Sequence, residues 1–357
     1  MTTRLAPPKH IRTPMGAWHF FENVNLEKGE PHRIQYRGID GIEVLQFAEV
    51  SDTALRELKP FALLPDDELT AAHKKNLSGG LLIRVTKPVM RPLIITHTLA
   101  TSTCWHTLII IEDGASAKVI ESFEGEAKNV SHYTEVKVGE NATLFYADTQ
   151  GIQGDFITRK YARLARDASM DWFELTANQG TTYSRITSTL SAENAGTSIS
   201  TIYLGRKDAR MDVGAEAVHE AMHGRSKLLT KGVLAGEAKA IYEGTLRMGA
   251  RATKSDAYQE EHALLLSEGA DAKASPMLFI DNNDVSCSHA ATVGKPDEER
   301  LFYLQTRGLS SAAAKRLLIK AFVWPVIEAV PDYARQSIIA VAEPLIKRFA
   351  EFQLEEG

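Results

Sequence analysis

The sequence predicts a mostly β protein with a helical C-terminal part, and three observations lead to this prediction. Of the 13 prolines, eight lie at or before Pro92, five lie at or after Pro276, and residues 93–275 contain none. Central strands exclude proline because it cannot donate to a strand ladder. Within the same block apolar and polar residues alternate with a period of two, and after residue 296 a helical pattern replaces this alternation.

The N-terminal region, residues 1–80, is predicted to be mixed. Its clearest element is a helix over residues 65–77. Pro65 opens this segment, acidic residues occupy its first turn and Lys74-Lys75 its last, as the helix dipole favours. Ser78-Gly79-Gly80 then ends the predicted helix.

The central region, residues 81–293, is predicted to contain ten to sixteen short strands, from the usual strand length of about five residues. These runs are rich in Ile, Val, Thr, Tyr and Phe and are separated by glycine or asparagine. The clearest runs are 107–125, 132–148, 169–180, 197–205, 227–236 and 239–248. Such a series fits a sandwich, a barrel or a parallel β-helix. The pattern alone does not decide between them, but 183 proline-free residues without a linker favour the solenoid.

The C-terminal region, residues 294–357, is predicted to be helical. Pro and acidic residues begin a helix at 296–308 that ends in Gly308, and two longer helical patterns follow at 310–330 and 331–352. An apolar helical pair at the end of a solenoid usually caps that end. An exposed apolar stripe would instead mark a partner site.

Composition excludes several classes of protein. The chain has 357 residues, a net charge of −5, 44% hydrophobic and 24% charged residues, which is typical of a soluble globular protein. We expect no membrane span, no secretory leader and no general affinity for nucleic acid. Two cysteines, Cys104 and Cys287, are too few for a disulfide scaffold or for a four-thiolate cluster, and they indicate a cytoplasmic compartment.

No nucleotide-binding loop, dinucleotide fingerprint or nucleophile elbow occurs in the sequence. His219 and His223 superficially match a zincin motif, but the glycine that follows and the surrounding strands indicate polar residues on a turn or strand. Cys287 and His289 are separated by one residue, so a strand would place both on one face. Such a pair can bind a metal or act as a nucleophile and base, or it can be a buried cysteine beside a hydrogen-bonded histidine.

The stretch from Lys254 to Phe322 makes the sequence recognisable. It contains LLLS, C-x-H-x-A-T-x-G and LFYLQ-x-RG in order, and it resembles the closing region of the SufB/SufD family of iron–sulfur cluster assembly scaffolds. The resemblance extends upstream to about residue 210 and is weak before residue 80. It implies a right-handed parallel β-helix with helical terminal regions. That expectation agrees with the proline-free block.

The resemblance also indicates a SufD-like member. SufB-like members carry a scaffold cysteine and a glutamate at positions that correspond here to Ile280 and Ala290, and neither residue can ligate iron. SufD-like members carry the C-x-H pattern that Cys287 and His289 match. The resemblance implies that these two residues contribute to a transient iron–sulfur cluster shared with a SufB-like subunit, or with a second copy of this chain. No catalytic or cofactor-binding residue is predicted.

The resemblance further implies that a separate ATPase, SufC, docks on residues 297–329, with Phe302, Tyr303, Arg307 and Gly308 at the contact. ATP would act only through SufC, whose closure would twist the SufB–SufD pair and expose its interface. A β-helix carbohydrate-active enzyme is the alternative from another class, since Asp281 and Asp284 could form a carboxylate pair. Their position in an Asn-rich turn favours a structural role instead.

Overall fold

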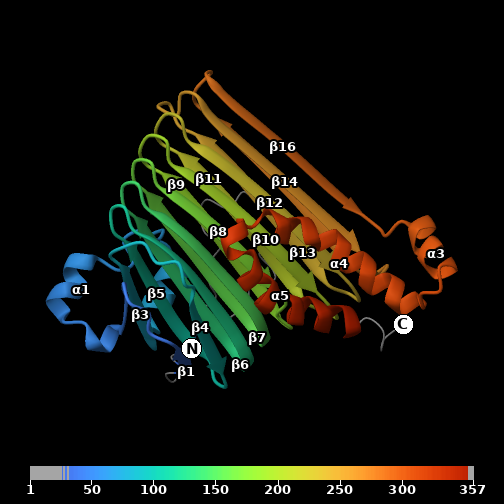
Figure 1. Ribbon diagram of the computed structural model, residues 1–357. Coiled ribbons are helices and arrows are strands. Elements are labelled where there is room, and N and C mark those ends of the chain that lie inside the picture. The colour runs from blue at the N-terminus through green and yellow to red at the C-terminus, as the bar shows by residue number, and fades with distance from the viewer. Residues whose placement is uncertain (1–25, 27–28, 30–31, 353–357) are drawn as a thin grey trace.

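The computed structural model describes Leu26, Gly29 and residues 32–352. In this part of the chain sixteen strands form one sheet that winds into a parallel β-helix (Figure 1). Only β1 and β2 pair in the antiparallel sense, with β4 and β3 respectively. The first eight strands are β1 (Arg33–Tyr36), β2 (Ile42–Gln46), β3 (Gly79–Val85), β4 (Leu93–Leu99), β5 (Thr103–Ile111), β6 (Ser116–Val138), β7 (Thr143–Leu164) and β8 (Ser169–Thr176). The remaining strands are β9 (Thr181–Leu190), β10 (Gly196–Gly205), β11 (Arg210–His219), β12 (Arg225–Leu234), β13 (Lys239–Met248), β14 (Ser255–Leu265), β15 (Asp271–Ile280) and β16 (Val285–Gly294).

The solenoid has two walls, which we call wall A and wall B. Wall A contains β4, the first halves of β6 and β7, and then β8, β10, β12, β14 and β16 in that order. Wall B contains β3, β5, the second halves of β6 and β7, and then β9, β11, β13 and β15. The predicted β-helix and the predicted strands of the proline-free block are therefore confirmed.

β6 and β7 run through both walls, so each must bend at the corner between them. Glycines stand at these bends: Gly125 has a φ of +125° and Gly154 a φ of +148°, a conformation that side chains strongly disfavour. A Cβ atom on Gly154 would also lie 1.8 Å from the carbonyl oxygen of Ala127 in the neighbouring coil. Glycine at position 154 thus permits both the backbone conformation and the close stacking of coils.

Alternate residues of every coil face the space between the walls. Leu144 and Tyr146 of β7 and Met170 and Trp172 of β8 belong to one continuous buried core between the walls. The intervening residues point outward, as the two-residue period of a strand requires.

The last two strands leave the solenoid open at one end. Among the strands of the described residues, β15 pairs only with β13, and β16 pairs only with β14. Pro276 lies within β15, beyond the block from which proline is absent. An edge strand tolerates proline because one of its sides has no partner to which an N–H would donate. We call the free edges of β15 and β16 the open end.

The N-terminal helices are α1 (Asp52–Leu58) and α2 (Glu68–Lys75), and a short 3-10 helix spans Phe47–Glu49. The helix predicted over 65–77 is therefore shorter than expected. Asp67 caps α2 by accepting the N–H of Thr70 at 2.9 Å, so Pro65 lies outside it, and Gly79 already begins β3. The aspartate carboxylate accepts a backbone N–H of the first helical turn, whereas a proline at the cap has no side-chain acceptor for it. Leu69 of α2 packs against the outer face of wall B.

The C-terminal helices are α3 (Glu298–Thr306), α4 (Ser311–Ala329) and α5 (Asp332–Phe352), close to the predicted bounds. α4 and α5 lie across the outer face of wall A (Figure 1), where Ile319 and Ile338 pack in one cluster with Phe145 and Phe173. The interpretation of these helices as an end cap is therefore wrong, because the outward positions of β7 and β8 carry large apolar side chains that need covering. The contact reaches far back along the chain, since Lys118 Nζ donates to the carbonyl of Tyr333 at 3.2 Å, 215 positions away.

Candidate functional site at the open end

Cys287 and His289 both lie on β16, the edge strand of wall A. Their register partners on β14 are Ala257 and Gln259, whose side chains face the interior. The two residues therefore share the inner face of the strand, as their spacing predicts. Cys287 packs against the inner core, whereas His289 is exposed.

The Cys287 thiol is not activated in the isolated chain. Burial raises the pKa of Cys287 above its usual value, and the nearby charge of Asp256 adds to this effect. A thiol with a raised pKa is a weak nucleophile and a weak ligand until a cation or a metal ion lowers its pKa. This chemistry disfavours a nucleophile–base pair within the lone chain.

Ile280 and Ala290 flank this pair without adding a ligand. Ile280 is the last residue of β15 and 47% of its surface is exposed. In the turn between β15 and β16, Asn282 Oδ1 accepts the N–H of Asp284 at 2.8 Å. This bond supports the structural interpretation of the acidic Asn-rich turn.

The other candidate donors lie elsewhere in structural roles. Cys104 is buried on β5, and burial raises its pKa to about 12. His219 ends β11 with its Nε2 2.8 Å from Ser226 Oγ, and His223 lies in a turn with a φ of +60°. Over Leu26, Gly29 and residues 32–352, no three His, Cys, Asp or Glu side chains come together as a metal site. In the described part of the chain, the candidate donors at the open end are therefore the two residues Cys287 and His289.

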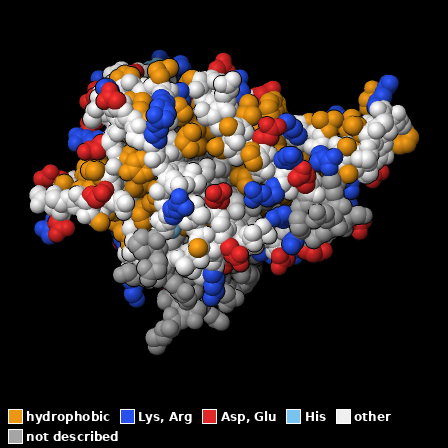
Figure 2. All heavy atoms as spheres, turned by 60° about the horizontal axis from the view of Figure 1, so that its bottom comes forward, with side chains coloured by type: hydrophobic (Ala, Val, Ile, Leu, Met, Phe, Trp, Pro, Cys, Tyr) orange, Lys and Arg blue, Asp and Glu red, His pale blue; other side chains and the backbone are white. Residues whose placement is uncertain are grey.

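The predicted partner contact lies on and just after α3, which projects away from the solenoid (Figure 1). Phe302 and Tyr303 are 68% and 55% exposed, and the guanidinium of Arg307 lies 5.0 Å from the centre of the Tyr303 ring. Gly308 follows with a φ of +92°, which turns the chain toward α4. Figure 2 shows hydrophobic and basic side chains together at the tip of the molecule where α3 lies. Large exposed aromatic side chains of this kind are typical of interfaces.

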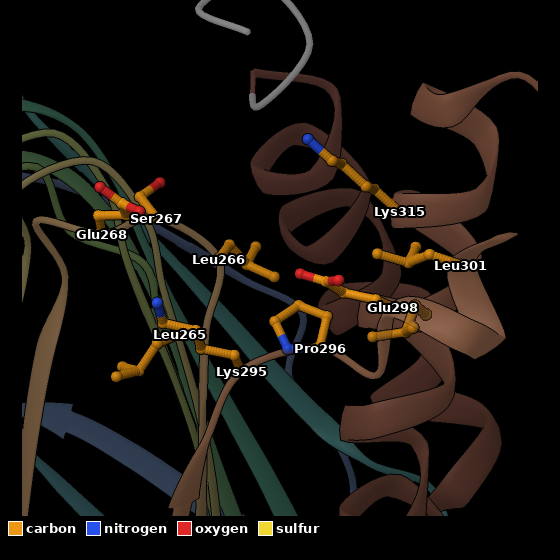
Figure 3. A pocket seen from close by; sticks show the side chains of 10 residues that line it. Leu265, Leu266, Ser267, Glu268, Lys295, Pro296, Glu298, Leu301 and Lys315 are labelled. Carbon is orange, nitrogen blue, oxygen red and sulfur yellow. The ribbon is translucent and has the colours of Figure 1, made fainter.

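A pocket of about 250 Å³ separates α3 from the solenoid. In Figure 3, Leu266 approaches it from the turn after β14, Leu301 from α3 and Lys315 from α4. Its full lining is Leu265, Leu266, Ser267, Glu268, Lys295, Pro296, Glu298, Leu301, Lys315 and Leu318. The pocket shares α3 with the predicted partner contact through Glu298 and Leu301, and no sequence pattern predicted it.

Sequence reasoning also missed the polar groups inside the solenoid. Lys160 Nζ lies 2.6 Å from Glu174 Oε1 and 3.0 Å from Asp148 Oδ2, all three fully buried between the walls. Burial raises the pKa of Asp148 to about 7, against the attraction of Lys160. Polar residues at inward positions of alternating strands were the available signal, but only the register of the coils shows which of them meet.

A second interior group lies closer to the open end. The hydroxyl of Tyr203 donates to Glu261 Oε1 at 2.9 Å, and burial raises the pKa of Glu261 to about 7. Gln259 lies two residues before Glu261 on the same face of β14, with 2% of its surface exposed. The polar interior therefore extends to β14, the strand that pairs with β16, on which His289 lies.

Known proteins support the resemblance seen in the sequence. A family model described as "SUF system FeS cluster assembly, SufBD core domain" matches residues 94–322. The chain is 28% identical to the iron–sulfur cluster assembly protein SufD of Bacillus subtilis, over 81% of this chain and 69% of that protein. It is 24% identical to a SufBD family protein of Synechocystis and 29% identical to one of Pyrococcus horikoshii, each over 74% of this chain. It spans 59% and 62% of the length of those two relatives.

The fold and the site define a parallel β-helix protein with a pair of candidate metal donors, Cys287 and His289, at its open end. The family match covers more than half of the chain and includes both donors. The chain belongs to the SufBD family of iron–sulfur cluster assembly proteins, and it is SufD-like. Among the described residues, no helix is both long enough and apolar enough to cross a membrane.

Proposed function

We propose that this chain is the SufD-like subunit of a SUF complex, in which it supports cluster assembly on a SufB-like partner. The observation that carries the proposal is the position of Cys287 and His289 on the inner face of an edge strand that pairs on one side only. A nascent iron–sulfur cluster would be the cargo of this site. Thiolate and neutral imidazole both bind iron, but two donors are fewer than the four that hold a typical cluster. The missing ligands would come from the partner.

The open end is the proposed contact with that partner. Edge strands present unpaired N–H and C=O groups, which readily pair with a strand of another chain. Exposed apolar residues at this end, Ile280 and Val293, would be covered by such an association. A partner's solenoid that continues β15 and β16 would place its own donors beside His289.

We propose that the ATPase SufC docks on α3 and α4 within residues 297–329, so that ATP acts only through this separate subunit. The exposed aromatic rings of Phe302 and Tyr303, with the basic group of Arg307 beside them, support this site. The division into regions 1–80, 81–293 and 294–357 belongs to the same proposal. So does a cytoplasmic location, which a sequence with only two cysteines supports.

A self-sufficient homodimer is the second candidate. Two copies joined at their open ends would bring two Cys287–His289 pairs together, which makes four donors. A carbohydrate-active enzyme has less support. Asp281 and Asp284 lie in the turn between β15 and β16, where Asn282 Oδ1 accepts the N–H of Asp284, and the carboxyl groups of Asp148 and Glu174 are buried where no polysaccharide could reach.

Purification of the tagged chain from its native host, followed by mass spectrometry of bound subunits, tests the proposal. We expect a SufB-like protein and a SufC-like ATPase. The isolated chain should hold no stable cluster after anaerobic reconstitution with iron and sulfide. A stoichiometric, chelator-resistant chromophore on a preparation that contains only this chain would overturn the heteromeric proposal in favour of the homodimer.

A further inference from the structure

Gln259 is a buried amide whose hydrogen-bonding groups are unused among the described residues. It lies on the inner face of β14 and is 2% exposed, yet both Oε1 and Nε2 lack a hydrogen-bond partner among the described residues. Buried amides are normally satisfied, because an unmade hydrogen bond costs the full desolvation of the group. We therefore expect the amide of Gln259 to find a hydrogen-bond partner when the open end is in its functional state.

The register of the sheet limits what that partner can be. On one side Gln259 pairs with Leu228 of β12, an apolar residue, and on the other with His289 of β16. Residues in register on parallel strands point to the same face and stand about 4.8 Å apart. The imidazole of His289 is therefore the adjacent polar group across the ladder.

The oxygen of this amide is seated against wall B. A Cβ atom on Gly244 would lie only 2.5 Å from Gln259 Oε1, so glycine at position 244 makes room for the amide where it lies. Glu261, on the same strand, is engaged through Oε1 by Tyr203 and does not hold the amide.

We infer that Gln259 is a positioning residue for His289: its amide bonds one ring nitrogen and thereby leaves the other nitrogen free to face the open end. This inference rests on the proposed function, in which His289 is a ligand. A neutral imidazole has one nitrogen that donates and one that accepts, and the bond at one nitrogen sets which state the other adopts. The amide selects the tautomer by the group it turns to the ring: Nε2 donates to an unprotonated nitrogen, whereas Oε1 accepts from a protonated one, and neither adds charge.

The test is the tautomer of His289, read from the 15N shifts of its ring in the full chain labelled on histidine. The signal is assigned by its loss in His289→Gln, and spectra are taken where the ring is neutral. Gln259→Leu should shift the tautomer ratio by about fivefold, the bias that one hydrogen bond of ordinary net strength supports. Thr230→Val is the matched control. It removes a buried polar group from the inner face of β12, but its register partner on β14 is Glu261, so the ratio should not change.

Thermal unfolding separates positioning from a structural role. Because the only bond that the proposal gives Gln259 is to the exposed ring of His289, Gln259→Leu should change the unfolding temperature little. Gln259→Met, an unbranched substitute, repeats both measurements if leucine disturbs the packing. Unchanged His289 shifts in the variants, or a clear loss of stability, would overturn the inference. A changed tautomer with normal cluster yield on the assembled complex would uphold the positioning and count against His289 as a ligand.

Discussion

Lys160 Nζ lies 2.6 Å from Glu174 Oε1 at the centre of the solenoid, where neither side chain reaches solvent. Asp148 completes the group at 3.0 Å from the same nitrogen. Although burial opposes its charge, the two carboxyl groups together raise the pKa of Lys160 above its usual value. The charge states of Lys160 and Asp148 therefore depend on their neighbours in this buried group.

Lys160→Met should lower the free energy of unfolding by about 3–5 kcal/mol, because it leaves buried acidic groups without their cation. Urea unfolding measures this loss. The control is Lys320→Met, which breaks the exposed pair with Glu343 and should cost less than about 1 kcal/mol. Equal losses for the two variants would contradict the importance of the buried group.

Gly154→Ala should destabilise the protein by about 3 kcal/mol or more, since it adds strain at a positive φ to a clash with the carbonyl of Ala127. Gly196→Ala is the matched control in β10, where the nearest atom to an added Cβ lies 3.9 Å away. That variant should be neutral or slightly stabilising. The midpoints of denaturant unfolding measure both changes. If Gly154→Ala were as stable as Gly196→Ala, glycine would not be required at the bend of β7.

Glu261→Gln should change how stability depends on pH. Burial raises the pKa of Glu261 to about 7 in the folded state, so between its unfolded value near 4.5 and about 7 the folded chain binds more protons than the unfolded chain. The stability that this residue contributes is therefore full below the lower value and is lost as the pH rises. The variant should be more stable than wild type by about 1–3 kcal/mol at pH 8 and equal to it near pH 4.5. A difference that does not vary with pH in urea unfolding would argue against this shift.

His289→Ala should abolish cluster formation on the assembled complex and leave assembly intact, because alanine provides neither a ligand nor a base. Cys287→Ser should be milder, because serine keeps the size and some polarity at the site and the essential thiol is expected on the partner. The yield of cluster absorbance per complex, with subunit composition checked by gel filtration, measures both. Wild-type yield from His289→Ala would return this residue to a structural role.

Arg307→Glu should weaken binding of the SufC-like ATPase by about tenfold while folding is unaffected, since the side chain is exposed at the end of α3. Arg166→Glu makes the same charge change at an exposed residue in the turn after β7 and should leave binding unchanged. A pull-down titration compares the two. If deletion of the C-terminal helices left ATPase binding unchanged on a folded solenoid, the docking proposal would fail.

The architecture could be predicted because its rules are local. The absence of proline and the two-residue period both reflect constraints on single strands. These two signals correctly predicted strands as far as β15, the edge strand that contains Pro276. The C-terminal helices followed from caps such as Ser310 and from the glycine at position 308. Only the resemblance to a known family, however, separated a β-helix from a sandwich, since both produce the same alternation.

The interior and the surfaces could not be predicted because they depend on register. Lys160 and Glu174 meet only because β7 bends between the walls and β8 returns beside its first half. Cys287 and His289 were found from spacing within one strand, whereas Gln259 is 30 positions from His289 and becomes its neighbour only through the ladder. To predict that α4 and α5 cover wall A, one would likewise need to know which strand positions face outward.

The bond between Lys118 and Tyr333 has a consequence for how the protein is made. At an ordinary ribosomal rate, roughly 10 to 40 seconds separate the synthesis of these two residues. During that interval the coils can stack while Phe145 and Phe173 remain uncovered, as α4 and α5 have not yet emerged. A nascent or truncated chain would therefore expose the apolar outer face of wall A to chaperones and proteases. This face becomes covered only when α4 and α5 have been synthesised and pack against it.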